Sequence, residues 1–75
     1  MLYWPCAKYI NGNGLVDDLI TYEGCDTLNA AKQQIQFWAD AHGFILTEAH
    51  IDTYPPGGKV CVSTLNLQEG TWDDV

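Results

Sequence analysis

The chain has 75 residues and a net charge of −7, with ten carboxylates, three lysines and no arginine. This length allows one domain with a small core, and an aromatic content of 12% helps to build that core from few residues. The charge argues against direct binding to nucleic acid or to anionic membranes, because both would need several lysine or arginine side chains.

A β-hairpin is predicted at the start of the chain. Residues 1–10 are rich in strand formers, but Pro5 cannot donate to a ladder, which favours an edge strand or an irregular lead-in. Residues 11–14, with the sequence Asn-Gly-Asn-Gly, give the strongest turn signal, because Asn-Gly pairs supply the positive φ of tight turns. Residues 15–23 are predicted as the second strand, centred on residues 19–22.

An amphipathic helix is predicted over residues 27–42. Asp26 or Thr27 can cap the first turn, because its side-chain oxygen can accept a hydrogen bond from a free backbone N–H. Gly43 is typical of the residue that ends a helix. One helical face carries four apolar residues, which are Leu28, Ala31, Ile35 and Trp38. His42 lies on the same face. We expect this face to pack on a sheet.

Phe37 lies off that helical face and aligns instead with Ala30 and Ala41, which makes a second, smaller apolar strip. Two interpretations remain open. Either a loop or Trp72 covers Phe37, or Phe37 is an exposed contact for a partner or for a second copy of the chain.

Two more strands are predicted at residues 44–54 and 59–67, joined by a turn at residues 55–58. The prediction is therefore a single α+β domain over residues 1–67, in the order β-β-α-β-β, with an antiparallel sheet packed on one helix. Residues 68–75 are predicted as an acidic C-terminal tail. Both later strands carry apolar residues on both faces, although one helix covers only one face. We expect residues 1–6, the tail or another subunit to cover part of the second face.

Glu48, His50 and Asp52 alternate along the third predicted strand, so their side chains should point the same way. The two carboxylates would stand about 13 Å apart, at about 3.3 Å per residue. Paired-carboxylate glycosidases need about 5–9.5 Å, so that chemistry is not indicated. The row is either a solvated acidic face or part of a negative surface for a basic partner.

The cysteines are odd in number and far apart: Cys6, Cys25 and Cys61. Residues 1–10 lack the features of a signal peptide, so the expectation is a cytoplasmic protein with reduced thiols. Structural zinc sites bring ligands in close pairs such as C-x2-C, and none is present, so no metal and no cofactor are predicted. No catalytic motif is found, and an enzyme is not expected.

The charge and simplicity of the chain favour a small protein-binding module or inhibitor that occupies the basic surface of a nucleic-acid-binding protein. Small acidic inhibitors from phages and other mobile elements, including those directed against restriction and CRISPR systems, act in this way, and the comparison rests on size and charge. One alternative is a homo-oligomeric accessory protein, such as a homodimer, that associates through an apolar sheet face. The other is a small-molecule-binding domain. The predicted partner-binding residues are Asp17, Asp18, Asp40, Glu48 and Asp52, with Phe37 as an apolar anchor.

Overall fold

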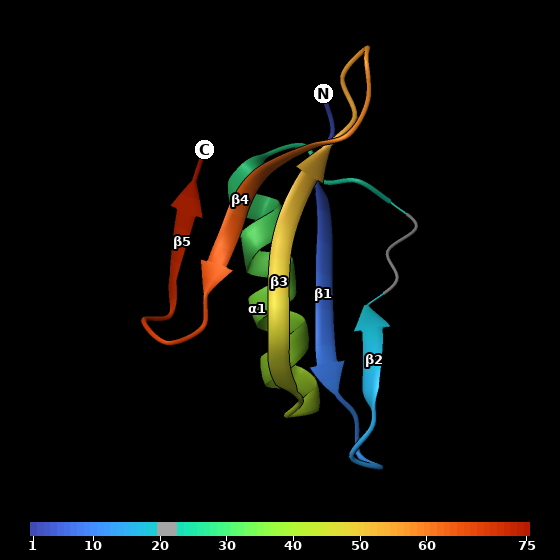
Figure 1. Ribbon diagram of the computed structural model, residues 1–75, viewed down its shortest axis with the longest axis vertical. Coiled ribbons are helices and arrows are strands. Elements are labelled where there is room, and N and C mark those ends of the chain that lie inside the picture. Colours follow the sequence, from blue (N-terminus) through green and yellow to red (C-terminus); the bar gives the residue numbers. More distant parts are fainter. Residues whose placement is uncertain (20–22) are drawn as a thin grey trace.

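The computed structural model describes residues 1–19 and 23–75, and these ranges form one helix and five strands. The elements in chain order are β1 (Trp4–Ile10), β2 (Val16–Leu19), α1 (Leu28–His42), β3 (Ile45–Thr53), β4 (Val60–Asn66) and β5 (Thr71–Asp74). The strands form one antiparallel sheet in the order β2-β1-β3-β4-β5, and α1 lies along one face of it (Figure 1). The predicted α+β class is confirmed, with a fifth strand added.

The hairpin between β1 and β2 turns at the predicted residues. The Asn11 N–H donates to the Leu15 carbonyl at 2.8 Å, and the Asn11 side-chain oxygen accepts from the Asn13 N–H at 2.9 Å. Gly14 has a φ of 78°, which glycine adopts without a side-chain clash. The predicted strand centre continued into residues 20–22, which lie outside the described residues.

The prediction that Pro5 places the first strand at an edge is wrong, because β1 lies between β2 and β3. In the described ranges, β2 pairs with only Ala7–Ile10, whereas β3 pairs with β1 as far as Trp4. Pro5 lies past the described β2 pairing, and on the other side of β1 it pairs with Ile51 of β3.

The helix matches its prediction to within one residue. The Thr27 hydroxyl oxygen accepts from the Ala30 N–H at 3.0 Å, and Gly43 ends the helix with a φ of 67°. The buried helical residues are Ala31, Ile35 and Ala39, whereas Leu28 and Trp38 are half-buried and His42 is exposed. No helix in the described ranges is long and apolar enough to cross a membrane.

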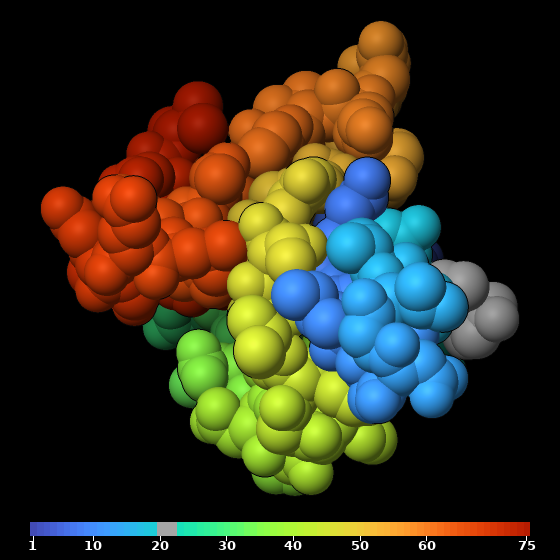
Figure 2. Space-filling model, turned by 60° about the horizontal axis from the view of Figure 1, so that its bottom comes forward, coloured from blue at the N-terminus to red at the C-terminus, as the bar shows by residue number. Residues whose placement is uncertain are grey.

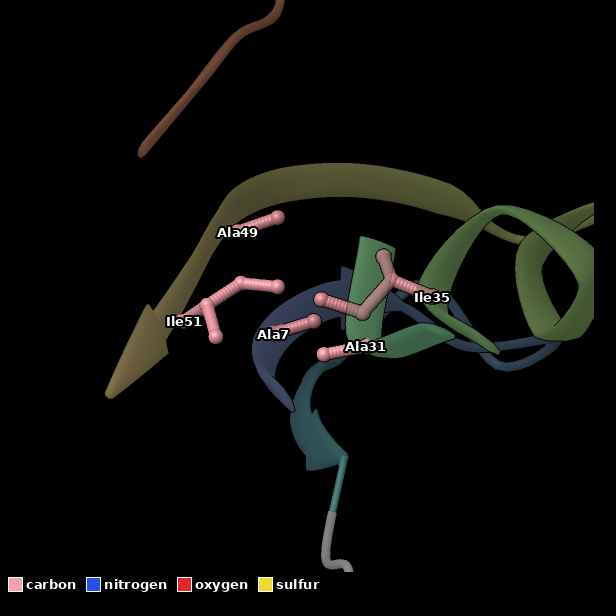
Figure 3. Packing of buried hydrophobic residues seen from close by; sticks show 5 residues of the cluster. All are labelled: Ala7, Ala31, Ile35, Ala49 and Ile51. Atoms are coloured by element: carbon pink, nitrogen blue, oxygen red, sulfur yellow. The ribbon is translucent and has the colours of Figure 1, made fainter. Parts of the chain in front are cut away.

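The core is small and built largely from alanine. Figure 3 shows Ala31 and Ile35 of α1 pointing toward Ala7 of β1 and toward Ala49 and Ile51 of β3. Ile35 and Ile51 have no exposed surface, and the alanines let the helix backbone approach the sheet closely. The backbone of α1 lies closest to β1 and β3, two central strands of the sheet.

Residues 68–75 are not the tail that the sequence suggested, because residues 71–74 pair with β4 as strand β5. Trp72 is half-buried and packs against the core, with Lys32 Nζ 5.9 Å from its ring centroid. The Asp74 carboxylate accepts from Lys32 Nζ at 2.8 Å and from the Ser63 hydroxyl at 2.6 Å. The last strand is thus held by both apolar and charged contacts.

Candidate functional site on the open sheet face

The face of the sheet opposite α1, called the open face below, is the main candidate for function. No helix or strand in residues 1–19 and 23–75 lies across it (Figure 1). The expected covering of this face is therefore not found in the described chain: residues 4–10 form β1 and residues 71–74 form β5. Paired residues on neighbouring strands point to the same face, so the strand register arranges the open face in rows.

The first row is apolar and lies at the hairpin end of the sheet. Val16 of β2 pairs with Ile10 of β1, which pairs with Ile45 of β3. Val16 is 65% exposed and Ile45 is 66% exposed. These two β-branched side chains therefore contact solvent on either side of Ile10, which lies on the strand between them. We call these three residues the apolar row. Figure 2, with this end turned forward, shows β1 and β2 (blue) beside β3 (yellow).

The second row is charged and lies directly behind the apolar row. Asp18 of β2 and Glu48 of β3 both pair with Lys8 of β1, and all three side chains are exposed. Two carboxylates thus flank one ammonium group on the open face. We call these three residues the charged row.

Behind the charged row, the strands β1, β3 and β4 bring together thiols, an imidazole and a carboxylate. Cys6 pairs with His50, which pairs with Thr64, and in the next row Trp4 pairs with Asp52, which pairs with Cys61. A groove of about 500 Å³ runs along β3 and β4 beside these rows, and its lining includes His50, Asp52, Lys59 and Cys61.

Two of these side chains converge on one carboxylate oxygen of a third. Asp52 Oδ2 lies 3.5 Å from Cys6 Sγ and 3.2 Å from His50 Nε2. Asp52 is only 2% exposed, and its other oxygen, Oδ1, is buried without a hydrogen-bond partner among the described residues. We call these three residues the Cys6–His50–Asp52 cluster.

The cluster is not arranged as an activated nucleophile. Burial, followed by the Asp52 carboxylate, raises the pKa of the Cys6 thiol to about 11, so the thiol is protonated at neutral pH. Nucleophilic cysteines have a lowered pKa and a thiol paired directly with imidazole. In this cluster the carboxylate stands between the thiol and the imidazole, so Asp52 binds both groups.

The six predicted partner-binding residues do not form one surface. Asp18 and Glu48 lie together on the open face and are exposed. Asp52 points to the same face as predicted, but it is buried, so it does not belong to a solvated acidic row. The reason is that Cys6, His50 and the β4 strand surround its carboxylate.

The other three predicted residues lie elsewhere. Asp17 pairs with Tyr9, whose ring contacts Trp38 of α1, so Asp17 is on the helix side of the sheet. Asp40 and Phe37 belong to α1, in the second layer of the molecule. Phe37 is 76% exposed, which rules out the interpretation that Trp72 or a described loop buries it.

The sequence did not reveal the apolar row or Lys8 as site residues, and it singled out His50 and Asp52 without their neighbour Cys6. These groups come from strands that are distant along the chain and become neighbours only through the register of β1 with β2 and β3. Strand pairing brings Cys6 next to residues 44 and 46 positions later in the chain, so the spacing of residues along the sequence could not show this cluster.

No protein-family model, curated protein or solved structure matches the chain significantly. The chemistry of the open face therefore rests on its own residues.

Proposed function

We propose that the protein is a small acidic binding module that inhibits a partner by occupying the partner's basic, nucleic-acid-binding surface. The observation that carries the proposal is the apolar row, exposed on the open face and bordered by the carboxylates of Asp18 and Glu48. A small domain seldom leaves β-branched side chains paired across three strands in water unless another surface covers them.

The chemistry of the two rows indicates the kind of surface that would fit. Protein interfaces commonly have an apolar centre and a polar rim. Here the centre would be Ile10, Val16 and Ile45, and the rim would be Asp18 and Glu48. A net charge of −7 attracts basic surfaces over long range and speeds their encounter. Carboxylates of this kind can occupy lysine and arginine sites that otherwise hold phosphates.

The same charge disfavours a second copy of the chain as the occupant. Two copies that met through their open faces would bring two chains of charge −7 together, with the Asp18 and Glu48 carboxylates near the contact. The partner is therefore a different protein, in the cytoplasm where the three free cysteines stay reduced.

The experiment is a comparison of three double variants in capture from a lysate of the source organism. Val16→Ser/Ile45→Ser removes the apolar row, and Asp18→Asn/Glu48→Gln removes the carboxylates beside it. Asp40→Asn/Glu69→Gln is the matched control, because it removes the same charge from the helix and from the turn before β5. Circular dichroism verifies that each variant is folded.

The proposal expects one nucleic-acid-binding protein that is retained by the wild type and by the control, lost with both open-face variants, and displaced by heparin. Its association rate should fall as salt is added. A partner retained equally by the open-face variants would overturn the proposal. So would a wild-type dimer in light scattering that becomes a monomer in Val16→Ser/Ile45→Ser, since that result favours the homo-oligomeric alternative.

A further inference from the structure

We propose that Cys6, His50 and Asp52 bind one divalent transition-metal ion of the zinc type, with a fourth coordination position open to the groove along β3 and β4. This site is separate from the apolar row and does not depend on the proposed partner. It lies on the open face, two rows away from Ile10, Val16 and Ile45.

Two of the three ligand–ligand distances in the cluster are close to those of a tetrahedral site. Metal–ligand bonds of about 2.3 Å to sulfur and about 2.0 Å to nitrogen and oxygen place tetrahedral ligand atoms about 3.3–3.6 Å apart. Cys6 Sγ and Asp52 Oδ2 are separated by 3.5 Å, and His50 Nε2 and Asp52 Oδ2 by 3.2 Å. One ligand atom from each residue lies within 4.8 Å of the others. Small side-chain rotations therefore suffice to surround an ion.

Beside its contact with His50 through Oδ2, the Asp52 carboxylate offers a second indication that the cluster binds a cation. It is 2% exposed, and Oδ1 has no hydrogen-bond partner in the described chain. A buried charged oxygen without a partner is costly, and buried carboxylates are usually paired with a cation or a metal. Lys59 lines the same groove, but no described ion pair joins it to Asp52.

The donor set selects the class of metal. Thiolate and imidazole ligands suit zinc and similar ions, whereas magnesium and calcium prefer oxygen ligands only. Binding requires that the Cys6 thiol release its proton to solvent as the sulfur–metal bond forms and one metal-bound water leaves. Thiolate and carboxylate then balance the two positive charges of the ion.

The fourth position has two candidate occupants, a water molecule or Cys61. Cys61 pairs with Asp52 across β3 and β4, but its thiol lies 3.6 Å from the Ser63 carbonyl oxygen and 3.6 Å from Thr64 Oγ1. These contacts direct the Cys61 sulfur along its own strand. We assign the fourth position to water, which the adjoining groove can admit. Three protein ligands and one water are the usual set of an accessible zinc site.

The test is titration of the reduced, full-length protein with Co²⁺ and Zn²⁺. One Co²⁺ per chain should give the intense visible bands of four-coordinate cobalt and a near-ultraviolet sulfur-to-cobalt band, and Zn²⁺ should displace it. Cys6→Ser should abolish the sulfur band. His50→Gln and Asp52→Asn should weaken Zn²⁺ binding by about a hundredfold or more, since loss of a second-shell residue already costs about 10–100-fold.

The matched controls are Cys25→Ser and His42→Gln, which remove the same kinds of group outside the cluster, and both should bind Zn²⁺ as the wild type does. Cys61→Ser should also bind normally if the fourth ligand is water. The half-buried His50 tolerates substitution best, so His50→Gln remains informative if Asp52→Asn unfolds. Absence of one-to-one binding, a cobalt spectrum without the sulfur band, or equal losses in the two control variants would overturn the site.

Discussion

At the scale of single residues, the contacts around Asp74 attach the last strand to the rest of the molecule. Ser63 is fully buried, and its hydroxyl donates to the Asp74 carboxylate at 2.6 Å. A hydrogen bond to a charged group contributes about 1.5–3 kcal/mol to stability. Ser63→Ala should therefore lower the free energy of unfolding by about 1.5–3 kcal/mol in urea denaturation. Thr64→Ala, an exposed neighbour, should change it by less than about 0.5 kcal/mol, and equal losses would contradict this role.

The same carboxylate predicts how stability depends on pH. Lys32, and then Ser63, hold the pKa of Asp74 below its usual range. A depressed pKa in the folded state gives stability that is present above the ordinary carboxyl value of about 3.9 and is lost as the pH falls through the folded value. Asp74→Asn should therefore weaken the dependence of the free energy of unfolding on pH in the acid range, as measured by urea denaturation at a series of pH values. Asp73→Asn is the control, because Asp73 has no ion pair with any described residue, and its curve should keep the wild-type slope.

At the scale of elements, the helix is both the firmest prediction from the sequence and the main source of core contacts. Ile35 is fully buried between α1 and the sheet, whereas Phe37 on the same helix is 76% exposed. Ile35→Ala should lower the free energy of unfolding by about 3 kcal/mol, because it removes buried methyl groups and leaves a cavity. Phe37→Ala should cost less than about 0.5 kcal/mol. Denaturation of both variants tests this, and a large loss for Phe37→Ala would mean that the aromatic ring is covered.

The helix was predictable because its signals are local. Thr27, Gly43 and the spacing of the apolar residues between them define the two ends and the buried face. Strand β5 was missed for the opposite reason. Its partners are Lys32 in the helix and residues of β4, and nothing in residues 68–75 reveals such distant contacts. The central position of β1 was also missed, because a single proline does not show how many strands lie beside its own.

At the scale of the whole molecule, the sequence could predict the kinds of residue in the candidate site but not which of them lie together. The sequence indicated surplus apolar residues on the sheet, and it left open whether Phe37 is covered or exposed. It could not indicate which strand lies beside which, and the open face is defined by that order. Cys6 meets His50 and Asp52 only because β1 pairs with β3. Carboxylates lie both on the helix and on the sheet, so the negative charge is spread over the surface and is not confined to one patch.

This distribution of charge predicts that salt stabilises the fold. The protein carries a charge of −7 within a radius of gyration of 12.2 Å, and compaction brings these charges together. The Debye length falls from about 30 Å at 0.01 M to about 10 Å at 0.1 M, so added NaCl should screen this repulsion at the scale of the molecule. The free energy of unfolding should rise over this range. Asp18→Asn/Glu48→Gln should reduce the slope, and Lys8→Gln should increase it. Identical slopes in all three proteins would mean that salt acts by another route than screening of the surface charge.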